Sequence, residues 1–283
     1  MNLIVFKVTV EFGWGFISRV AGLSKSSPSF FYPPPTTFLG ALASVIAKKY
    51  DLGEDKGKDV IVELSKNLLA INLKPENCIP LRYSDISRII TIKQTGTLIN
   101  GKRIPIQFPN VINLVQSFDS PARGKTILVS LADDEPPRIT WIVIFRDNVV
   151  KVNDKEIVIT DDLFWRINRI GAKESIVSVI DVKKFSGIKY SFGRTLTYYS
   201  FPYDVSFKEV DRYGEWCIEK YINPFSMTSY NPLQQYTGGE EIIEFYSPII
   251  VSGESSIIID IPENSCFCKY KVNDIEVIGR CPI

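Results

Sequence analysis

Three consecutive prolines at residues 33–35 constrain the fold of this chain more than any other feature of its sequence. Each proline ring fixes the backbone angle φ, so the segment is held extended. The hydroxyls of Thr36 and Thr37, which follow, are expected to accept hydrogen bonds from the first free amides of a helix. Apolar residues then recur at helical spacing, at Leu39, Leu42 and Ile46. The sequence predicts a rigid loop and a capped helix that runs to about Tyr50.

The predicted start of this helix is surrounded by residues that suit a nucleic acid. Cations precede it, and three aromatic residues at positions 30–32 lead into the prolines. Free amides at a helix start attract phosphate, and aromatic rings stack on bases. The candidate binding residues here are Arg19, Lys25, Tyr32, Thr36 and Thr37.

Hydrophobic periodicity predicts the order of the remaining elements. Apolar residues alternate along 3–12, which indicates a half-buried strand, and a second helix is expected from about Asp59 to Ala70. Further strands are predicted at 138–145, 149–152, 156–159 and 175–182, with a helix capped by Thr160 over about 161–170. Short apolar runs predict more strands at 245–251, 256–261 and 268–278.

Residues 82–125 have the pattern of an inserted β-arm. Asn100 and Gly101 separate two apolar runs, and Asn-Gly is a strong hairpin signal because both residues tolerate positive φ. Lys93 lies on one limb, and Lys102 and Arg103 lie at the predicted tip. Such an arm would reach along a strand of RNA.

Composition excludes several classes of function. The chain has 283 residues, of which none is histidine, so most hydrolase and zinc-site arrangements are not available. The five cysteines form no Cys-x-x-Cys pair, which favours free thiols or one late disulfide over a metal site. The glycine spacing supports neither ATP nor NAD, so no cofactor is expected. We expect a cytoplasmic protein with no membrane partner, because no apolar run approaches a membrane span and no signal peptide is seen.

Charge is unevenly distributed along the chain. Residues 82–125 contain seven Lys or Arg and two acids, and residues 166–194 contain the same numbers. Residues 203–283 contain six Lys or Arg and thirteen acids. A basic surface attracts a phosphate backbone, and an acidic one repels RNA or docks a basic neighbour. Segregated solvated surfaces are the alternative explanation.

Two sequence blocks resemble those of a known family. Pro33-Pro34-Pro35-Thr36-Thr37-x-x-Gly40-Ala41-x-Ala43 follows a strand that ends in Gly-x-Gly. The second block runs from Trp165 to Val179 and contains Arg169-x-Gly171-x-Lys173-Glu174-Ser175-x-Val177-Ser178-Val179. Together they resemble CRISPR-associated protein family five of the RAMP superfamily, a subunit of archaeal type I-A (Cascade) effector complexes.

The resemblance implies an α+β fold: a ferredoxin-like (RRM-like) RNA-binding domain at 1–182, with the β-arm as a thumb at about 82–125. A β-rich C-terminal domain would follow at 183–283. The implied function is non-catalytic: binding the 5′ handle of CRISPR RNA and closing one end of the filament of family-seven backbone subunits. The implied partners are CRISPR RNA, the family-seven subunit and the large subunit of the complex. Further candidate RNA contacts are Lys93, Lys102, Arg103, Arg166, Arg169, Lys173, Lys189 and Arg194. The last two lie within 185–199, which is either a flexible loop that holds phosphates or a mobile hairpin loop followed by a β-run.

Two alternatives to this function stay open. One is a metal-independent endoribonuclease that processes CRISPR precursor RNA, with Tyr32 or Tyr83 and Lys25 or Lys93 as the acid–base groups. The absence of histidine weakens it, because unperturbed phenol and ammonium groups titrate far above neutral pH. The other is a β-rich scaffold that binds only protein.

Overall fold

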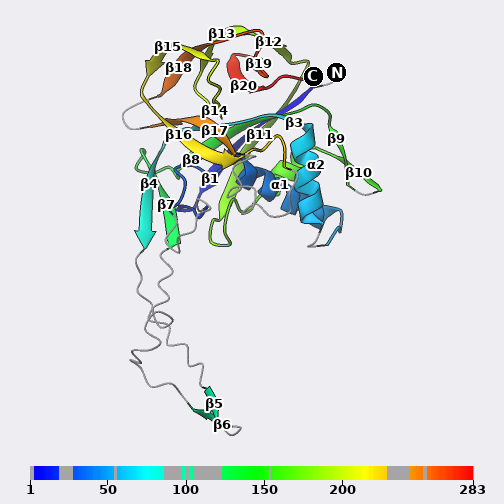
Figure 1. Cartoon of the computed structure of the whole chain (residues 1–283), viewed down its shortest axis with the longest axis vertical. Coiled ribbons are helices and arrows are strands. Elements are labelled where there is room, and N and C mark those ends of the chain that lie inside the picture. The colour runs from blue at the N-terminus through cyan, green and yellow to red at the C-terminus, as the bar shows by residue number, and fades with distance from the viewer. Residues whose placement is uncertain are drawn as a thin grey trace.

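The computed structural model describes residues 3–18, 28–53, 56–85, 97–99, 102–104, 123–152, 154–227, 242–250 and 254–282. They form a mixed, strand-rich fold of helices and strands around a central antiparallel sheet (Figure 1). The strands of this sheet, in spatial order, are β11 (Val177–Ser186), β1 (Ile4–Phe12), β8 (Arg138–Phe145) and β3 (Leu68–Pro75). In sequence, α1 (Pro35–Lys49) and α2 (Gly57–Asn67) lie between β1 and β3, and α4 (Asp161–Trp165) lies between β8 and β11.

The helices cover one face of the central sheet. Alternate residues of β1, from Phe6 to Phe12, point into this layer and are fully buried. Phe38 of α1 stacks on Trp141 of β8 at 4.9 Å between ring centroids, and Phe6 lies 4.5 Å from Phe164 of α4. The apolar side of β1 and the apolar side of α1 therefore pack together in one core.

The start of α1 differs from the predicted cap. Pro34 is the N-cap residue, and its carbonyl accepts the amides of Thr37 at 2.8 Å and Phe38 at 3.3 Å. Thr36 and Thr37 lie inside the first turn, and no side chain caps the helix. The prediction of threonine caps was wrong because Pro35, whose fixed φ suits a first helical position, already belongs to the helix.

Two predicted helices are shorter than expected. α2 ends at Asn67, and the apolar residues Leu68, Leu69 and Ala70 begin β3. All three are buried because β3 has packed layers on both faces, so their continuous apolarity does not distinguish strand from helix. α4 ends at Trp165, and Thr160 does not cap it; the Thr160 hydroxyl donates instead to Asp162.

The C-terminal region packs on the opposite face of the central sheet. Val5, Ile142 and Ile144 form a second core with Tyr270 and Val277. The strands of this region form three three-stranded sheets: β12 (Lys189–Ser191), β19 (Phe267–Val272) and β20 (Ile275–Arg280); β13 (Gly193–Thr197), β18 (Ser256–Ile261) and β15 (Lys208–Tyr213); β14 (Phe201–Pro202), β17 (Ile242–Ile249) and β16 (Glu215–Ile222). β12 and β13 fall within residues 185–199, which agrees with the alternative of a loop followed by a β-run rather than with one flexible loop.

Two buried features join this region to the central sheet. The side-chain amide of Asn72 in β3 donates to the carbonyls of Ser200 at 2.6 Å and Ile278 at 2.8 Å. Gly279 in β20 lies directly against the backbone of Leu69 and Ala70. The two parts are therefore in close backbone contact.

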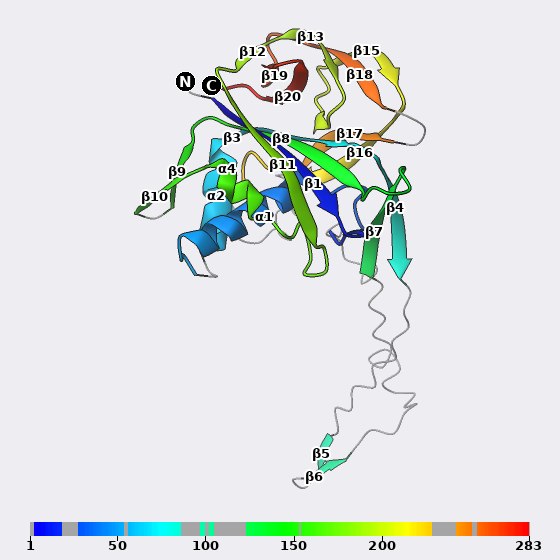
Figure 2. The ribbon, with the colours of Figure 1, turned by 180° about the vertical axis from the view of Figure 1, so that it is seen from behind.

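A two-stranded ribbon extends from the body in both views (Figures 1 and 2). It consists of β4 (Cys78–Asp85) and β7 (Arg123–Ser130), which pair antiparallel, and β2 (Gly15–Phe16) adds to β7. Between them in sequence, β5 (Thr97–Ile99) and β6 (Lys102–Ile104) pair around residues 100 and 101. A separate hairpin joins β9 (Val149–Val152) to β10 (Lys155–Val158).

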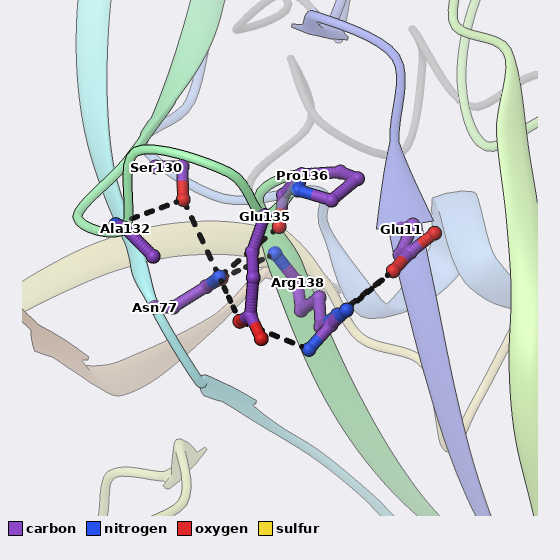
Figure 3. A network of polar contacts seen from close by, with 7 residues as sticks. All are labelled: Glu11, Asn77, Ser130, Ala132, Glu135, Pro136 and Arg138. Carbon is purple, nitrogen blue, oxygen red and sulfur yellow. Dashed lines mark hydrogen bonds and ion pairs between the residues drawn. The ribbon is translucent and has the colours of Figure 1, made fainter.

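A polar network fixes the base of the ribbon (Figure 3). Asn77, between β3 and β4, accepts the amide of Arg138 at 2.7 Å and donates to the Pro136 carbonyl at 3.1 Å. The Arg138 guanidinium donates to Glu11 of β1 at 2.8 Å and to Glu135 at 3.0 Å. The two turns at this end of the ribbon, β3 to β4 and β7 to β8, are therefore tied to the central sheet.

Three other features concern the described part of the chain. All five cysteines are free thiols. No group of three or more Cys, Asp or Glu residues that would hold a metal ion is found there. None of its helices is both long enough and apolar enough to span a membrane.

Candidate nucleic-acid interface

The two sequence blocks meet in space on either side of one cavity. The cavity has a volume of about 390 Å³ and lies between α1 and the segment that follows α4. Its lining from α1 is Thr37, Gly40, Ala41, Ser44, Val45, Lys48 and Lys49, and its lining from the second block is Arg166, Ile167, Asn168, Arg169 and Gly171. We call this the α1 cavity.

Small residues open the helix side of the α1 cavity. Gly40, Ala41 and Ser44 lie on one face of α1, because residues three and four apart in a helix share a face. Their short side chains leave space beside the helix. Lys48 and Lys49, both exposed, lie at the C-terminal end of α1, where the helix dipole favours positive charge.

The opposite side of the α1 cavity is a tight turn held by buried contacts. Ile167 is buried and anchors the segment, while Arg166 and Arg169 are exposed. Gly171 has φ of 112°, and a Cβ there would lie 3.0 Å from the Ile17 carbonyl oxygen. The buried Ser175 hydroxyl accepts the Ile17 amide at 3.0 Å. The turn is thus fixed against the end of β2.

The lining of the α1 cavity is strongly basic. It contains four cations, Lys48, Lys49, Arg166 and Arg169, and no carboxylate. Asp162 of α4 lies beside two of them: Lys49 donates to it at 2.8 Å, and the Arg166 Nε lies 3.6 Å from it. The hydrogen bond from Lys49, then that from Thr160 and the charge of Arg166, lower the pKa of Asp162. The pocket is therefore suited to an anion that competes with Asp162 for these cations.

Ser18, which precedes segment 19–27, lies next to Thr37 and also contacts two residues that follow the segment. The Ser18 and Thr37 hydroxyls are 3.3 Å apart. The Ser18 carbonyl accepts the Phe30 amide at 3.1 Å and the Ser29 hydroxyl at 3.0 Å. The segment that contains Arg19 and Lys25 therefore leaves and rejoins the described chain beside the start of α1.

The structure brings together only part of the predicted residue set. Thr37, Arg166 and Arg169 line the α1 cavity. Thr36 lies in the same helical turn but does not line it, and the exposed Lys173 lies in the turn after Gly171. Arg19, Lys25 and Lys93 lie outside the described residues, and of Lys102 and Arg103 only their strand, β6, is described.

Three predicted residues lie elsewhere. Tyr32 is completely buried, so its ring offers no face to a base, and burial raises the pKa of its phenol well above the ordinary value. Lys189 and Arg194 are exposed on β12 and β13, on the side of the central sheet away from α1 (Figure 1). These three do not belong to the α1 cavity.

Sequence reasoning missed the contribution of Lys48 and Lys49. Thr37, Ala41, Ser44 and Lys48 are spaced by four, three and four residues, which places them on one face of a helix. That spacing is visible in the sequence. It was not informative alone, because only the position of Arg166 and Arg169 shows that this face is a wall of the pocket.

Comparisons with known proteins agree with the two sequence blocks. No model of a protein family matches the chain. Among curated proteins of Saccharolobus solfataricus, CRISPR system aCascade subunit Cas5 1 is 28% identical over 209 residues, covering 70% of this chain and 72% of that protein. CRISPR-associated protein Cas5 3 of the same organism is 26% identical over 201 residues, with the same coverage of both chains.

A solved structure covers nearly the whole chain. The crystal structure of a CRISPR protein from Archaeoglobus fulgidus is 40% identical in sequence and has a TM-score of 0.71. The match covers 99% of this chain and all of that one, so it includes the C-terminal strands as well as the two blocks. With these matches and both sequence blocks in the expected order, the chain belongs to the Cas5 family of CRISPR-associated proteins.

Proposed function

We propose that this protein is a non-catalytic, RNA-binding subunit of a type I CRISPR effector complex, and that the α1 cavity binds the backbone of CRISPR RNA. The observation that carries the proposal is the pocket itself: four cations and no carboxylate line it, and its walls come from the two blocks that resemble the family. Cations grouped in a groove neutralise phosphates and release counterions. The 5′ handle is the part of the RNA that we assign to this pocket.

The fold supports the proposal. The order β11-β1-β8-β3, with helices between β1 and β3 and between β8 and β11, matches the strand order of a ferredoxin-like domain. In an RNA recognition motif, bases stack on the open face of such a sheet. Here the C-terminal strands pack on that face through Tyr270 and Val277. We therefore place the RNA at the helix side and the ribbon.

Membership of a larger assembly follows from the relatives. One relative is named as a subunit of aCascade. We propose that this chain likewise caps a filament of family-seven subunits and contacts the large subunit, with the ribbon and its inserted arm directed along the RNA. Co-expression with a family-seven subunit and a CRISPR RNA tests this, and a stable ternary complex is expected. The proposal is contradicted if the co-expressed family-seven filament is purified with its RNA and this chain does not co-purify.

Nothing in the described site favours an endoribonuclease. A phenol whose pKa is raised by burial is a poorer base at neutral pH, so Tyr32 is unsuited to accept the 2′-hydroxyl proton. Tyr83 is exposed on β4, and its conversion to phenylalanine tests the remaining tyrosine. We expect no metal-independent cleavage of a repeat RNA by wild type or by Tyr83→Phe. Cleavage by wild type that is absent in Tyr83→Phe would contradict a non-catalytic role.

The direct test of RNA binding is equilibrium titration with single-stranded RNA at several salt concentrations. The double variant Arg166→Ala/Arg169→Ala should bind about tenfold more weakly at low salt, because the phosphates then lack the charge-assisted hydrogen bonds of both guanidinium groups. The slope of log affinity against log salt should fall by about 0.7 for each phosphate that is no longer neutralised. The control variant Lys208→Ala/Lys220→Ala removes two exposed cations of the C-terminal strands. Equal weakening of binding in both double variants contradicts a site in the α1 cavity.

A further inference from the structure

Arg82 and Phe31 form a stacked pair partway along the ribbon. The Arg82 guanidinium carbon lies 3.4 Å from the centre of the Phe31 ring. Phe31 is half-buried, whereas Arg82, on β4, is exposed. The guanidinium therefore covers the ring, and Arg82 remains accessible to solvent.

The Phe31 side of the pair is fixed by buried hydrogen bonds. The Phe31 amide donates to the Glu219 carboxylate at 2.9 Å, and Glu219 is only 7% exposed. Tyr221 donates its hydroxyl to the other oxygen of Glu219 at 2.7 Å. A backbone held by a buried carboxylate keeps the ring in one position, which lowers the entropy lost when a ligand stacks there.

The Arg82 side is fixed by the ribbon. Arg82 is paired with Thr126 of β7, and the buried Thr126 hydroxyl donates to the Phe30 carbonyl at 2.5 Å. The strand that carries Arg82 and the loop that carries Phe31 are thus tied together beside the stacked pair.

The pair is connected to the α1 cavity through a short run of contacts. Phe30 donates its amide to the Ser18 carbonyl, and the Ser18 hydroxyl lies 3.3 Å from that of Thr37. Thr37 lines the cavity. A short run of contacts therefore links the stacked pair, which includes ribbon residue Arg82, to a residue that lines the basic pocket.

We propose that Arg82, supported from below by Phe31, is a stacking platform for one unpaired base of the bound RNA. This inference rests on the proposed function and adds a base contact to the phosphate contacts of the α1 cavity. A planar guanidinium stacks on the face of a base, as it does on an aromatic ring, and bases that are unstacked in RNA loops and ends are bound in this way. The platform accepts any base, because each has a π-face.

The effect of replacing Arg82 would differ if its role were purely structural. If Arg82 only held the ribbon to the body, its replacement would lower thermal stability and leave the environment of each bound base unchanged. The variant Arg82→Lys separates the two roles, since lysine keeps the positive charge and loses the planar group.

The test uses the full chain and a set of single-stranded RNAs, each with one 2-aminopurine at a successive position. Stacking quenches the emission of this base, so wild type should quench one position more strongly than its neighbours. Arg82→Lys should abolish that quenching and weaken binding by about fivefold or more, the effect of losing one base stack. The salt slope should not change, because the charge remains.

Two further variants complete the design. Phe31→Leu should also reduce quenching at the same position, because the guanidinium loses its support. Arg212→Lys is the matched control, since Arg212 contacts the ring hydroxyl of Tyr246 in the C-terminal strands. If wild type binds the RNAs and Arg82→Lys shows the same quenching pattern, the platform is overturned and the proposed function is not. Failure of wild type to bind any of the RNAs overturns the proposed function and the platform together.

Discussion

Asp162 pairs with two of the four cations of the α1 cavity, so it would compete with the RNA that we propose binds there. Its carboxylate pairs with Lys49 and Arg166. Because its pKa is lowered in the folded protein, these pairs stabilise the fold above the ordinary pKa of an aspartate. That contribution is lost as the pH falls through the lowered pKa.

Removal of this carboxylate should strengthen RNA binding. Asp162→Asn frees Lys49 and Arg166 and removes a negative charge beside the phosphate, so affinity should rise about two- to fivefold, the size expected for an exposed ion pair. Asp161→Asn makes the same change of charge at the neighbouring exposed position. Titration of both variants at low salt checks this, and weaker binding by Asp162→Asn would mean that the carboxylate instead orients the cations.

Glu219 gives the protein a stability that depends on pH. Burial raises the pKa of Glu219 above its ordinary value of 4.5, so the folded state binds the proton more tightly than the unfolded state does. The stabilisation is fully present below the unfolded pKa and is lost as the pH rises through the folded pKa. At neutral pH, burial of the charged Glu219 carboxylate lowers the free energy of unfolding.

Urea unfolding at pH 7 and pH 5 tests this assignment. The free energy of unfolding of wild type, relative to that of Glu219→Gln, should be larger at pH 5 than at pH 7, because only wild type gains a proton at this position. Glu215→Gln, at an exposed position of the same strand, should show no such change. A difference between wild type and Glu219→Gln that is the same at both pH values would mean that Glu219 does not titrate in this range.

At the scale of elements, periodicity predicts the strands and helices whose burial is one-sided. Residues 3–12 alternate and form β1, and the apolar side of α1 is found where the spacing indicates it. Periodicity fails at β3, because burial on both faces removes the alternation. It also fails at β13, where the exposed Arg194 and Leu196 hide a strand whose alternate residues are buried.

The same limit applies to the candidate site. Thr37, Arg166 and Arg169 were recognised from their blocks, and their convergence on one pocket depends on how α1 packs beside α4. The burial of Tyr32 depends on contacts with strands far away in sequence, such as the link from Phe31 to Glu219. Contacts of this kind have no signature in local sequence.

The contact between β20 and β3 leads to a prediction about an element boundary. A Cβ on Gly279 would lie 2.3 Å from the Leu69 carbonyl oxygen and 2.5 Å from the Ala70 Cβ. Gly279→Ala should therefore separate the C-terminal strands from the central sheet and lower the free energy of unfolding by about 1–3 kcal/mol. In Gly57→Ala the new methyl group meets no atom within 4 Å, so the stability should hardly change. Equal stability of the two variants, measured by urea unfolding, would contradict this close contact.

At the scale of the whole molecule, the charges divide the protein partly as its layers do, except that Lys189 and Arg194 of the second basic run lie on the C-terminal strands β12 and β13. The α1 cavity, the helices and the ribbon lie on the body that carries the basic runs, and the C-terminal strands carry the excess of acids. Figures 1 and 2 show β12, β13, β15, β18, β19 and β20 on the far side of the central sheet from the helices. A polyanion is thus attracted to one side and repelled from the other.

Photocrosslinking of the full chain to single-stranded RNA containing 4-thiouridine, followed by identification of the crosslinked peptides, tests this division most directly. We predict crosslinks in peptides from α1, from residues 166–171 and from the region of Phe31 and Arg82. Crosslinks confined to the C-terminal strands β13, β15 and β18 would contradict the account.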